Sequence, residues 1–281
     1  MRKRILSGIV GFFLLTLILI RVESILLNIG ISIVIVFCVY ELLVATKYIH
    51  NKVLVVISIA FAAAVPFFRM PTFNITSRIF SLIFIMVLFA MMMLDRFHIT
   101  LEKIGLVFMI SIVVPIALSS VLYIRDEGLR AGRAGAIFMV LYTFIVCWGN
   151  DIGALFAGRF FGKHKLSPKI SPKKTVEGAI GGVIFEMLLI AALVWFFNNF
   201  KYWGGIEYNF SPLWLYLIGL IGAPISIFGD LAASVIKRQC AIKDFGSLIP
   251  GHGGVMDRFD SVLFVAPYIY VMTTYFPLIS K

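Results

Sequence analysis

The sequence predicts an all-α polytopic integral membrane protein with about nine transmembrane helices. Hydrophobic residues make up 61% of the 281 residues and charged residues only 14%, whereas about a quarter of a soluble domain is charged. In addition, apolar runs long enough to cross a bilayer, which takes about 20 residues, recur along the chain. The predicted spans lie at residues 5–20, 25–46, 53–68, 79–94, 104–124, 134–158, 176–198, 212–236 and 260–278.

The first five predicted spans contain few charged residues, and most polar clusters lie after residue 147. We therefore predict a transmembrane scaffold of about five spans at 1–130. A C-terminal transmembrane region of about four spans follows at 131–281 and carries the polar clusters. The first span begins with basic residues like a signal sequence, but no small-residue cleavage site follows it. We interpret it as an uncleaved span.

The distribution of Lys and Arg predicts the orientation, because cytoplasmic loops carry the excess of these residues. With alternating spans and a cytoplasmic N-terminus, the cytoplasmic side holds roughly twice as many Lys and Arg residues as the other side. The charged loops at 159–175 and 237–259 then face the cytosol. We expect a multi-pass protein of the cell (inner) membrane. The net charge of +11 follows from this topology and from attraction to anionic lipids, so no nucleic-acid partner is expected.

One polar cluster lies inside an otherwise apolar span, in the run from Trp148 to Arg159. An unpaired carboxylate at this depth is costly, so Asp151 is expected to face a cavity, a cation or a basic partner. Gly153 and Gly158 permit close helix packing. Two interpretations stay open: a glycine-rich packing face in which Asp151 pairs with a lysine, or one wall of a substrate or metal site.

A second cluster is the basic loop before the seventh span. Two Ser-Pro steps keep its backbone extended, so that Lys173 and Lys174 are displayed on a stiff segment. Thr175 is expected to cap the following helix, with Glu177 in its first turn. Lysines beside a helix N-terminus can bind phosphate. A basic loop that sets the topology and ends in an ordinary cap explains the same pattern.

The densest cluster is the charged run at 234–260 together with the helix before it. Asp230, Ser234 and either Lys237 or Arg238 are spaced to share one face of a helix. Because this helix runs out to the cytosol, the shared face would carry a carboxylate and one or two cations at the membrane surface.

Asp257 and Asp260 are spaced to share a helix face at the start of the last span. Oxygen ligands from two helix ends suit Mg²⁺, which binds through one or two carboxylates plus substrate phosphates. The glycines of the loop at 250–254 allow main-chain N–H groups to approach phosphate oxygens. The alternative is a basic loop flanked by carboxylates that form salt bridges.

Two further carboxylates lie in apolar spans, Glu41 near the cytoplasmic end of the second and Glu186 in the middle of the seventh. Each could be a helix–helix hydrogen-bond partner or could line a site. The sequence leaves both interpretations open.

These residues resemble the family of phosphatidate cytidylyltransferases, also called CDP-diacylglycerol synthases. The pattern S-x-φ-K-R-x4-K-D-x-G-x2-I-P-x-H-G-G-V-x-D-R-F-D, in which φ is Ile236, fits every position of the run 234–260. The resemblance extends to the region 148–178. In the first half of the chain only the pattern of predicted transmembrane spans resembles the family. Many members carry Tyr where this chain has Leu155 and Trp where it has Val176. Neither departure removes a charge, so both bear on substrate fit more than on chemistry.

The resemblance implies the reaction of CTP with phosphatidate to give CDP-diacylglycerol and pyrophosphate, with Mg²⁺ required. It also implies K⁺ as a possible second metal, a homodimer, and a cytosol-facing polar cavity in a catalytic C-terminal half. The expected metal ligands are Asp230 and Asp257. The expected catalytic residues are Asp230, Asp257, Asp260, Lys237 and Arg238. The expected substrate-binding residues are Lys173, Lys174, Ser234, Lys243, Asp244, His252, Gly253, Gly254, Arg258 and Asp151.

Three other functions compete with this expectation. A CTP-dependent lipid kinase, or a cytidylyltransferase that acts on another lipid phosphate, would need similar residues. A transporter would use intramembrane carboxylates as a relay, but the sequence shows no inverted repeat of the kind that transporters often carry. A non-catalytic scaffold would leave the clustering of Asp with Lys and Arg without a purpose.

Overall fold

A computed structural model describes residues 2–47, 49–68, 74–94, 99–199, 208–249, 251 and 253–280 of the chain. A helix lies at each of the predicted spans, which confirms the all-α class, and two short two-stranded β-sheets are added. The α-helices are α1 (Arg2–Ile20), α2 (Leu26–Ala45), α3 (Lys52–Ala64), α4 (Asn74–Leu94), α5 (Leu101–Leu129), α6 (Arg133–Phe144), α7 (Asn150–Phe161), α8 (Val176–Asn199), α9 (Pro212–Gln239), α10 (Met256–Phe259) and α11 (Val262–Tyr275). A 3₁₀ turn, η1 (Val65–Phe67), extends α3, and a π-helical turn, η3 (Ile145–Gly149), joins α6 to α7.

Among the described residues, six helical stretches are long and apolar enough to cross a membrane. They are Leu26–Ala45, Ser77–Leu94, Leu101–Leu129, Arg133–Phe161, Val176–Asn199 and Pro212–Gln239. The apolar stretches at the first and third predicted spans, Gly8–Ile20 and Lys52–Phe67, are shorter, and α11 at the last predicted span has only 14 residues. The structure thus supports a membrane protein with several spans, and the number nine and the orientation stay predictions.

The chain forms two compact units. The first contains Met1–Ser119 and Cys240–Arg258, and the second contains Ser120–Gln239 and Phe259–Lys281. The charged run at 240–258 therefore packs with the N-terminal spans, although it follows α9 in sequence. The predicted division into a scaffold at 1–130 and a catalytic region at 131–281 concerns function, and it stays a prediction.

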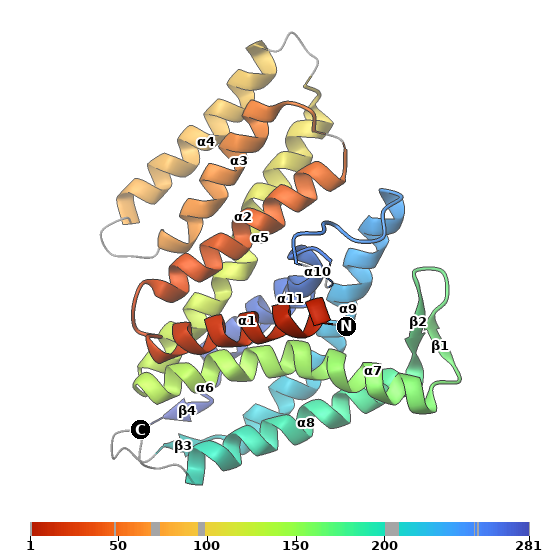
Figure 1. Cartoon of the computed structure of the whole chain (residues 1–281). Helices are drawn as coiled ribbons and strands as arrows, with labels where there is room; N and C mark the ends of the chain where they lie inside the picture. Colours follow the sequence, from red (N-terminus) through yellow and green to blue (C-terminus); the bar gives the residue numbers. More distant parts are fainter. Residues whose placement is uncertain are drawn as a thin grey trace. The chain divides into compact units, whose positions relative to one another are not determined.

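In the first unit, α2, α3 and α4 pack side by side (Figure 1). The Asn28 side-chain amide donates to the carbonyl of Pro66 at 2.9 Å, and the Ser32 hydroxyl donates to the carbonyl of Ala63 at 2.8 Å. These bonds satisfy polar groups that would be costly in lipid. Between α3 and α4, the rings of Phe61 and Phe84 stack at 4.0 Å.

In the second unit, α7 and α8 lie side by side and the hairpin β1–β2 joins their ends (Figure 1). Small residues allow this close approach: a Cβ added at Gly153 of α7 would lie 3.0 Å from the Cα of Gly182 in α8. Strand β1 (Lys165–Ser167) pairs antiparallel with β2 (Ser171–Thr175). A second two-stranded sheet pairs β3 (Asn209–Phe210) antiparallel with β4 (Ile279–Ser280), which follows α9, α10 and α11 in the chain.

Candidate functional site

The base of the β1–β2 hairpin is fastened to the start of α8 by side chains of the first helical turn. The Thr175 hydroxyl accepts the main-chain N–H of Gly178 at 3.1 Å, which confirms the predicted N-cap. The Glu177 carboxylate accepts the N–H groups of Lys163 at 3.1 Å and His164 at 3.2 Å, and it lies 2.6 Å from His164 Nδ1. Glu177 therefore holds the chain at the end of α7 against the start of α8.

The hairpin is also fastened to α9, and this contact joins two of the predicted clusters. Lys174 Nζ lies 2.5 Å from Asp230 Oδ2. The Arg238 guanidinium donates from Nε to the carbonyl of Ile170 in the hairpin turn at 3.4 Å. The side chains of Lys174 and Asp230 are 22% and 29% exposed, so the ion pair is accessible to solvent. The structure thus brings the predicted phosphate-binding lysine to a predicted metal ligand.

Asp260 lies in the turn between α10 and α11, only 5% exposed. Its carboxylate accepts the N–H of Ser261 at 2.9 Å and interacts electrostatically with Asp230, Lys237 and Asp151. We call these five residues, Asp151, Lys174, Asp230, Lys237 and Asp260, the aspartate–lysine cluster. It lies entirely in the second unit and contains five of the predicted site residues.

Gly229, next to Asp230, explains how α9 approaches the turn at Asp260. A Cβ at Gly229 would lie 2.9 Å from the carbonyl oxygen of Asp260 and 3.0 Å from the Cα of Ser261. Main-chain atoms cannot move aside as a side chain would, so only glycine fits at this contact.

Asp257 lies in the first unit, in the short helix α10. Its Oδ2 accepts the N–H of Phe245 at 2.9 Å and the N–H of Gly254 at 3.1 Å. Asp257 and Asp260 were expected on one face at the start of the last span. The structure instead ends α10 at Phe259 and begins α11 at Val262, because a turn at Asp260 and Ser261 separates the two helices.

Glu41, which the sequence left undecided, reaches from α2 to the same segment. Its Oε1 accepts the N–H of Val255 at 3.0 Å and its Oε2 accepts the N–H of Met256 at 2.9 Å. We call residues 245–256 the glycine segment. A carboxylate near the end of an apolar helix was visible in the sequence, but nothing in the sequence indicated its partners.

The predicted phosphate cradle requires main-chain N–H groups of the glycine loop that can donate to phosphate, and several of these groups already donate within the protein. The N–H groups of Gly254, Val255 and Met256 donate to carboxylates of the protein itself. Gly253 adopts a φ of +84°, a conformation that favours glycine. The predicted site residue His252 and its neighbour Pro250 lie outside the described residues, so the cradle stays a prediction.

The other predicted site residues are placed as follows. Ser234 lies one turn after Asp230 on α9 and is half-buried. Lys173 is exposed on β2 and Arg258 is exposed on α10. Lys243 and Asp244 are exposed in the segment after α9, and a Cβ at Gly253 would lie 3.6 Å from the Asp244 carboxyl carbon.

The donor chemistry of the aspartate–lysine cluster fits a hard divalent cation. Within the parts of the chain that the structure describes, no three His, Cys, Asp or Glu side chains form a metal-holding group by themselves. Mg²⁺ does not require one, because it keeps several waters and binds through one or two carboxylates plus substrate phosphates. Asp230 belongs to the second unit and Asp257 to the first, so their joint ligation of a metal stays a prediction.

Glu186, the other carboxylate left undecided, is fully buried in α8. Its Oε2 accepts the side-chain amide of Asn150, the first residue of α7, at 3.1 Å. Of the two interpretations left open, the structure shows the helix–helix hydrogen-bond partner.

Comparisons with known proteins identify the family of the chain and several of its relatives. The model of the cytidylyltransferase family matches residues 2–276. The chain is 39% identical over 142 residues to a phosphatidate cytidylyltransferase of Staphylococcus haemolyticus, covering 50% of this chain and 51% of the relative. It is 39% identical over 163 residues to a protein of the same name from Haemophilus influenzae, covering 58% and 54%. A Staphylococcus aureus relative with this name is 38% identical over 141 residues, covering 50% of each chain.

The chain spans about half the length of the curated relatives that it matches. The family model, in contrast, extends over nearly all of the chain. The chain therefore belongs to the cytidylyltransferase family.

Proposed function

We propose that the protein transfers the cytidylyl group of CTP to phosphatidate, giving CDP-diacylglycerol and pyrophosphate in phospholipid biosynthesis. The observation that carries this proposal is the Lys174–Asp230 pair at 2.5 Å, inside a cluster of three carboxylates and two lysines. Family membership and the names of the relatives support it. Such a cluster can hold both the phosphates and the cation that balances them.

To catalyse this reaction, the protein needs mainly to bind the two substrates and to neutralise their phosphate charges. Phosphatidate is a phosphate monoester whose second pKa is about 6, so it brings its own nucleophilic oxygen near neutral pH. In the proposed reaction that oxygen bonds to the α-phosphorus of CTP, while the bond from this phosphorus to the β-phosphate oxygen breaks. The electron pair leaves with pyrophosphate, and no general base is needed.

Cations are needed because a dianion must approach a triphosphate. We assign the neutralisation of these phosphates to the exposed and half-exposed basic residues of both predicted loops. Lys174 and Lys237 lie in the aspartate–lysine cluster and face the reacting phosphates in this proposal. The remaining proposed phosphate-binding cations are Lys173, Arg238, Lys243 and Arg258.

We propose that Asp230 and Asp257 hold Mg²⁺, with Asp260 and Asp151 as the next candidates and K⁺ as a possible second metal. Bound Mg²⁺ would neutralise phosphate charge and orient the attacking and leaving oxygens. Asp230 already binds a cation, the ammonium group of Lys174, which shows that its carboxylate points toward positive charge. Asp260 adds a buried carboxyl group that interacts with Asp230.

The proposed setting is a homodimer in the inner cell membrane, with the N-terminus and a polar cavity facing the cytosol. The excess of Lys and Arg in the loops assigned to the cytoplasm supports this orientation. In this arrangement the lipid arrives from the bilayer and CTP arrives from the cytosol.

CTP labelled in its α-phosphate tests the proposed transfer against the nearest alternative. The cytidylyl transfer predicts that the label enters the lipid. A lipid kinase would leave the label in CDP and would transfer label only from the γ-phosphate. A parallel reaction with an isoprenoid ether lipid phosphate distinguishes another lipid acceptor. Solute flux across sealed vesicles without nucleotide consumption would favour a transporter instead.

A further inference from the structure

Glu41 joins α2 to a segment more than two hundred residues away. It is only 4% exposed. Each of its carboxylate oxygens accepts one main-chain N–H, from Val255 at 3.0 Å and from Met256 at 2.9 Å, residues 214 and 215 positions further along the chain. Hydrogen bonds to an ionised acceptor are roughly twice as strong as neutral ones. This is therefore a strong attachment between a membrane helix and the glycine segment.

Two glycines leave the space that the Glu41 carboxylate fills. A Cβ at Gly254 would lie 2.5 Å from Oε2, and a Cβ at Gly246 would come closer still to Oε1. Any other residue at either position would push the carboxylate away from the N–H groups that it binds. The glycines of this segment thus serve the Glu41 contact, in addition to any role in substrate binding.

Asp257, the residue that directly follows the glycine segment, also binds main-chain donors of the segment. Its Oδ2 binds the N–H groups of Phe245 and Gly254, and it lies close enough to Glu41 for the two carboxylates to interact electrostatically. Four main-chain donors of the segment are thereby held by two carboxylates. The bonds of Asp257 to Phe245 and Gly254 link the beginning of the segment to its end, whereas the bonds of Glu41 link the segment to α2.

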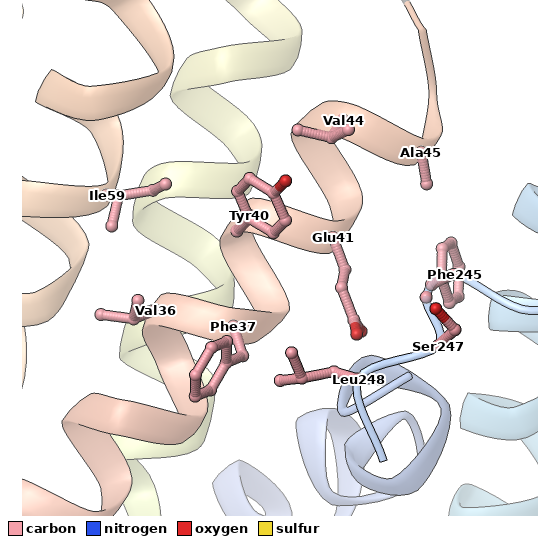
Figure 2. A pocket seen from close by; sticks show the side chains of 11 residues that line it. Val36, Phe37, Tyr40, Glu41, Val44, Ala45, Ile59, Phe245, Ser247 and Leu248 are labelled. Atoms are coloured by element: carbon pink, nitrogen blue, oxygen red, sulfur yellow. The ribbon is translucent and has the colours of Figure 1, made fainter. Parts of the chain in front are cut away.

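Residues 246–248 of this segment are loosely packed, whereas its apolar residues Phe245, Val255 and Met256 are buried. A cavity of about 660 Å³ lies beside Glu41, lined by α2, by Ile59 of α3 and by residues 245–248. Figure 2 shows Glu41 reaching across from α2 toward Phe245, Ser247 and Leu248. Leu248 is 50% exposed, so apolar contacts do not fix it. The hydrogen bonds of Glu41 supply a specific polar attachment of the segment to α2, in addition to the burial of Phe245, Val255 and Met256.

We propose that Glu41 is a positioning residue: it fixes the glycine segment to α2 and so sets where Asp257 and the neighbouring candidate residues lie. The part of this inference that concerns the reaction rests on the proposed function, while the part that concerns the segment does not. The residues that Glu41 would position are Lys243, Asp244, Gly253, Gly254, Asp257 and Arg258.

Hydrogen exchange on the full chain in detergent tests the attachment directly. Glu41→Gln replaces one acceptor oxygen by an amide donor that faces a main-chain N–H, so one bond is lost. We expect peptides that cover 245–256 to exchange about tenfold to a hundredfold faster, because a hydrogen bond to a charged group is removed. Glu23→Gln is the matched control, since Glu23 is exposed in the same unit, and it should leave this exchange unchanged.

Two further variants keep the test valid if Glu41→Gln does not accumulate. Gly246→Ala leaves the carboxylate intact but displaces it, so it should accelerate exchange in the same peptides. Glu41→Asp keeps two acceptor oxygens on a shorter side chain and should restore part of the protection. Unchanged exchange at 245–256 in Glu41→Gln or Gly246→Ala would overturn the proposal. So would an equal acceleration throughout the first unit, including 101–119.

Kinetics test the consequence for the reaction. Glu41→Gln should lower kcat by about tenfold or more because a misplaced Asp257 weakens the chemistry, and it should raise KM because the proposed phosphate-binding residues Lys243 and Arg258 are displaced with it. Glu41→Asp should recover part of kcat. If the wild type forms no CDP-diacylglycerol, the proposed function fails, and the exchange measurement still decides whether Glu41 holds the segment. Faster exchange with unchanged kcat would refute the positioning role.

Discussion

The contact between α7 and α8 allows a sharp test by substitution of Gly153 with alanine. The new Cβ would lie 2.5 Å from the Cβ of Phe185, 3.0 Å from the Cα of Gly182 and 3.1 Å from the carbonyl oxygen of Gly181. Two of these neighbours are main-chain atoms and the third is fixed to the main chain, so none can rotate away. The helices must separate, and overpacking of this kind costs about 1–3 kcal/mol.

Gly105→Ala is the matched control, because no atom lies within 4 Å of the Cβ it would add to α5. In both helices alanine gains about 1 kcal/mol of helix propensity over glycine. The difference between the two variants therefore isolates the overpacking, about 1–3 kcal/mol. Unfolding by SDS in mixed micelles, followed by circular dichroism, measures both stabilities. Equal midpoints for Gly153→Ala and Gly105→Ala would refute the close helix contact.

Substitutions at three other residues test the cap of α8, the Glu186 hydrogen bond and the proposed metal role. Thr175→Val removes the acceptor for the Gly178 N–H and should lower stability by about 0.5–2 kcal/mol in the same SDS titration; an unchanged midpoint would disprove the cap. Glu186→Gln keeps an acceptor for the Asn150 amide and should match the wild type, whereas Glu186→Ala leaves a buried donor unpaired and should cost about 1–3 kcal/mol; equal stability of the two would contradict the pairing. Asp257→Asn keeps an acceptor oxygen for its two main-chain donors, so exchange of the glycine segment should stay slow while Mg²⁺-dependent synthesis falls by about a hundredfold or more; full activity would exclude the metal role.

The helices were predictable because their cause is local. Each apolar run must satisfy its own main-chain groups in lipid, and a helix does so within the segment. The Thr175 cap was predictable for the same reason, since Thr175 binds a donor only three residues away. The break between α10 and α11 was not, because the sequence around Asp260 carries no proline or glycine that would end a helix.

The sequence predicted which residues belong to the candidate site better than it predicted which of them contact one another. Lys174 and Asp230 were both expected in it, but their pairing depends on how the hairpin meets α9. Likewise, Glu41 stood out as a carboxylate in an apolar helix, whereas its bond to Val255 depends on contacts across 214 residues. Such partners are determined by tertiary packing, and local sequence patterns do not predict it.

The proposed reaction is the transfer of the cytidylyl group of CTP to phosphatidate. Its most direct test measures both products from purified full-length protein with CTP, phosphatidate and Mg²⁺. Cytidylyl transfer should give one pyrophosphate for each CDP-diacylglycerol, with both products absent when phosphatidate or Mg²⁺ is left out. Release of CDP with a newly phosphorylated lipid, or pyrophosphate formation that does not depend on phosphatidate, would contradict it.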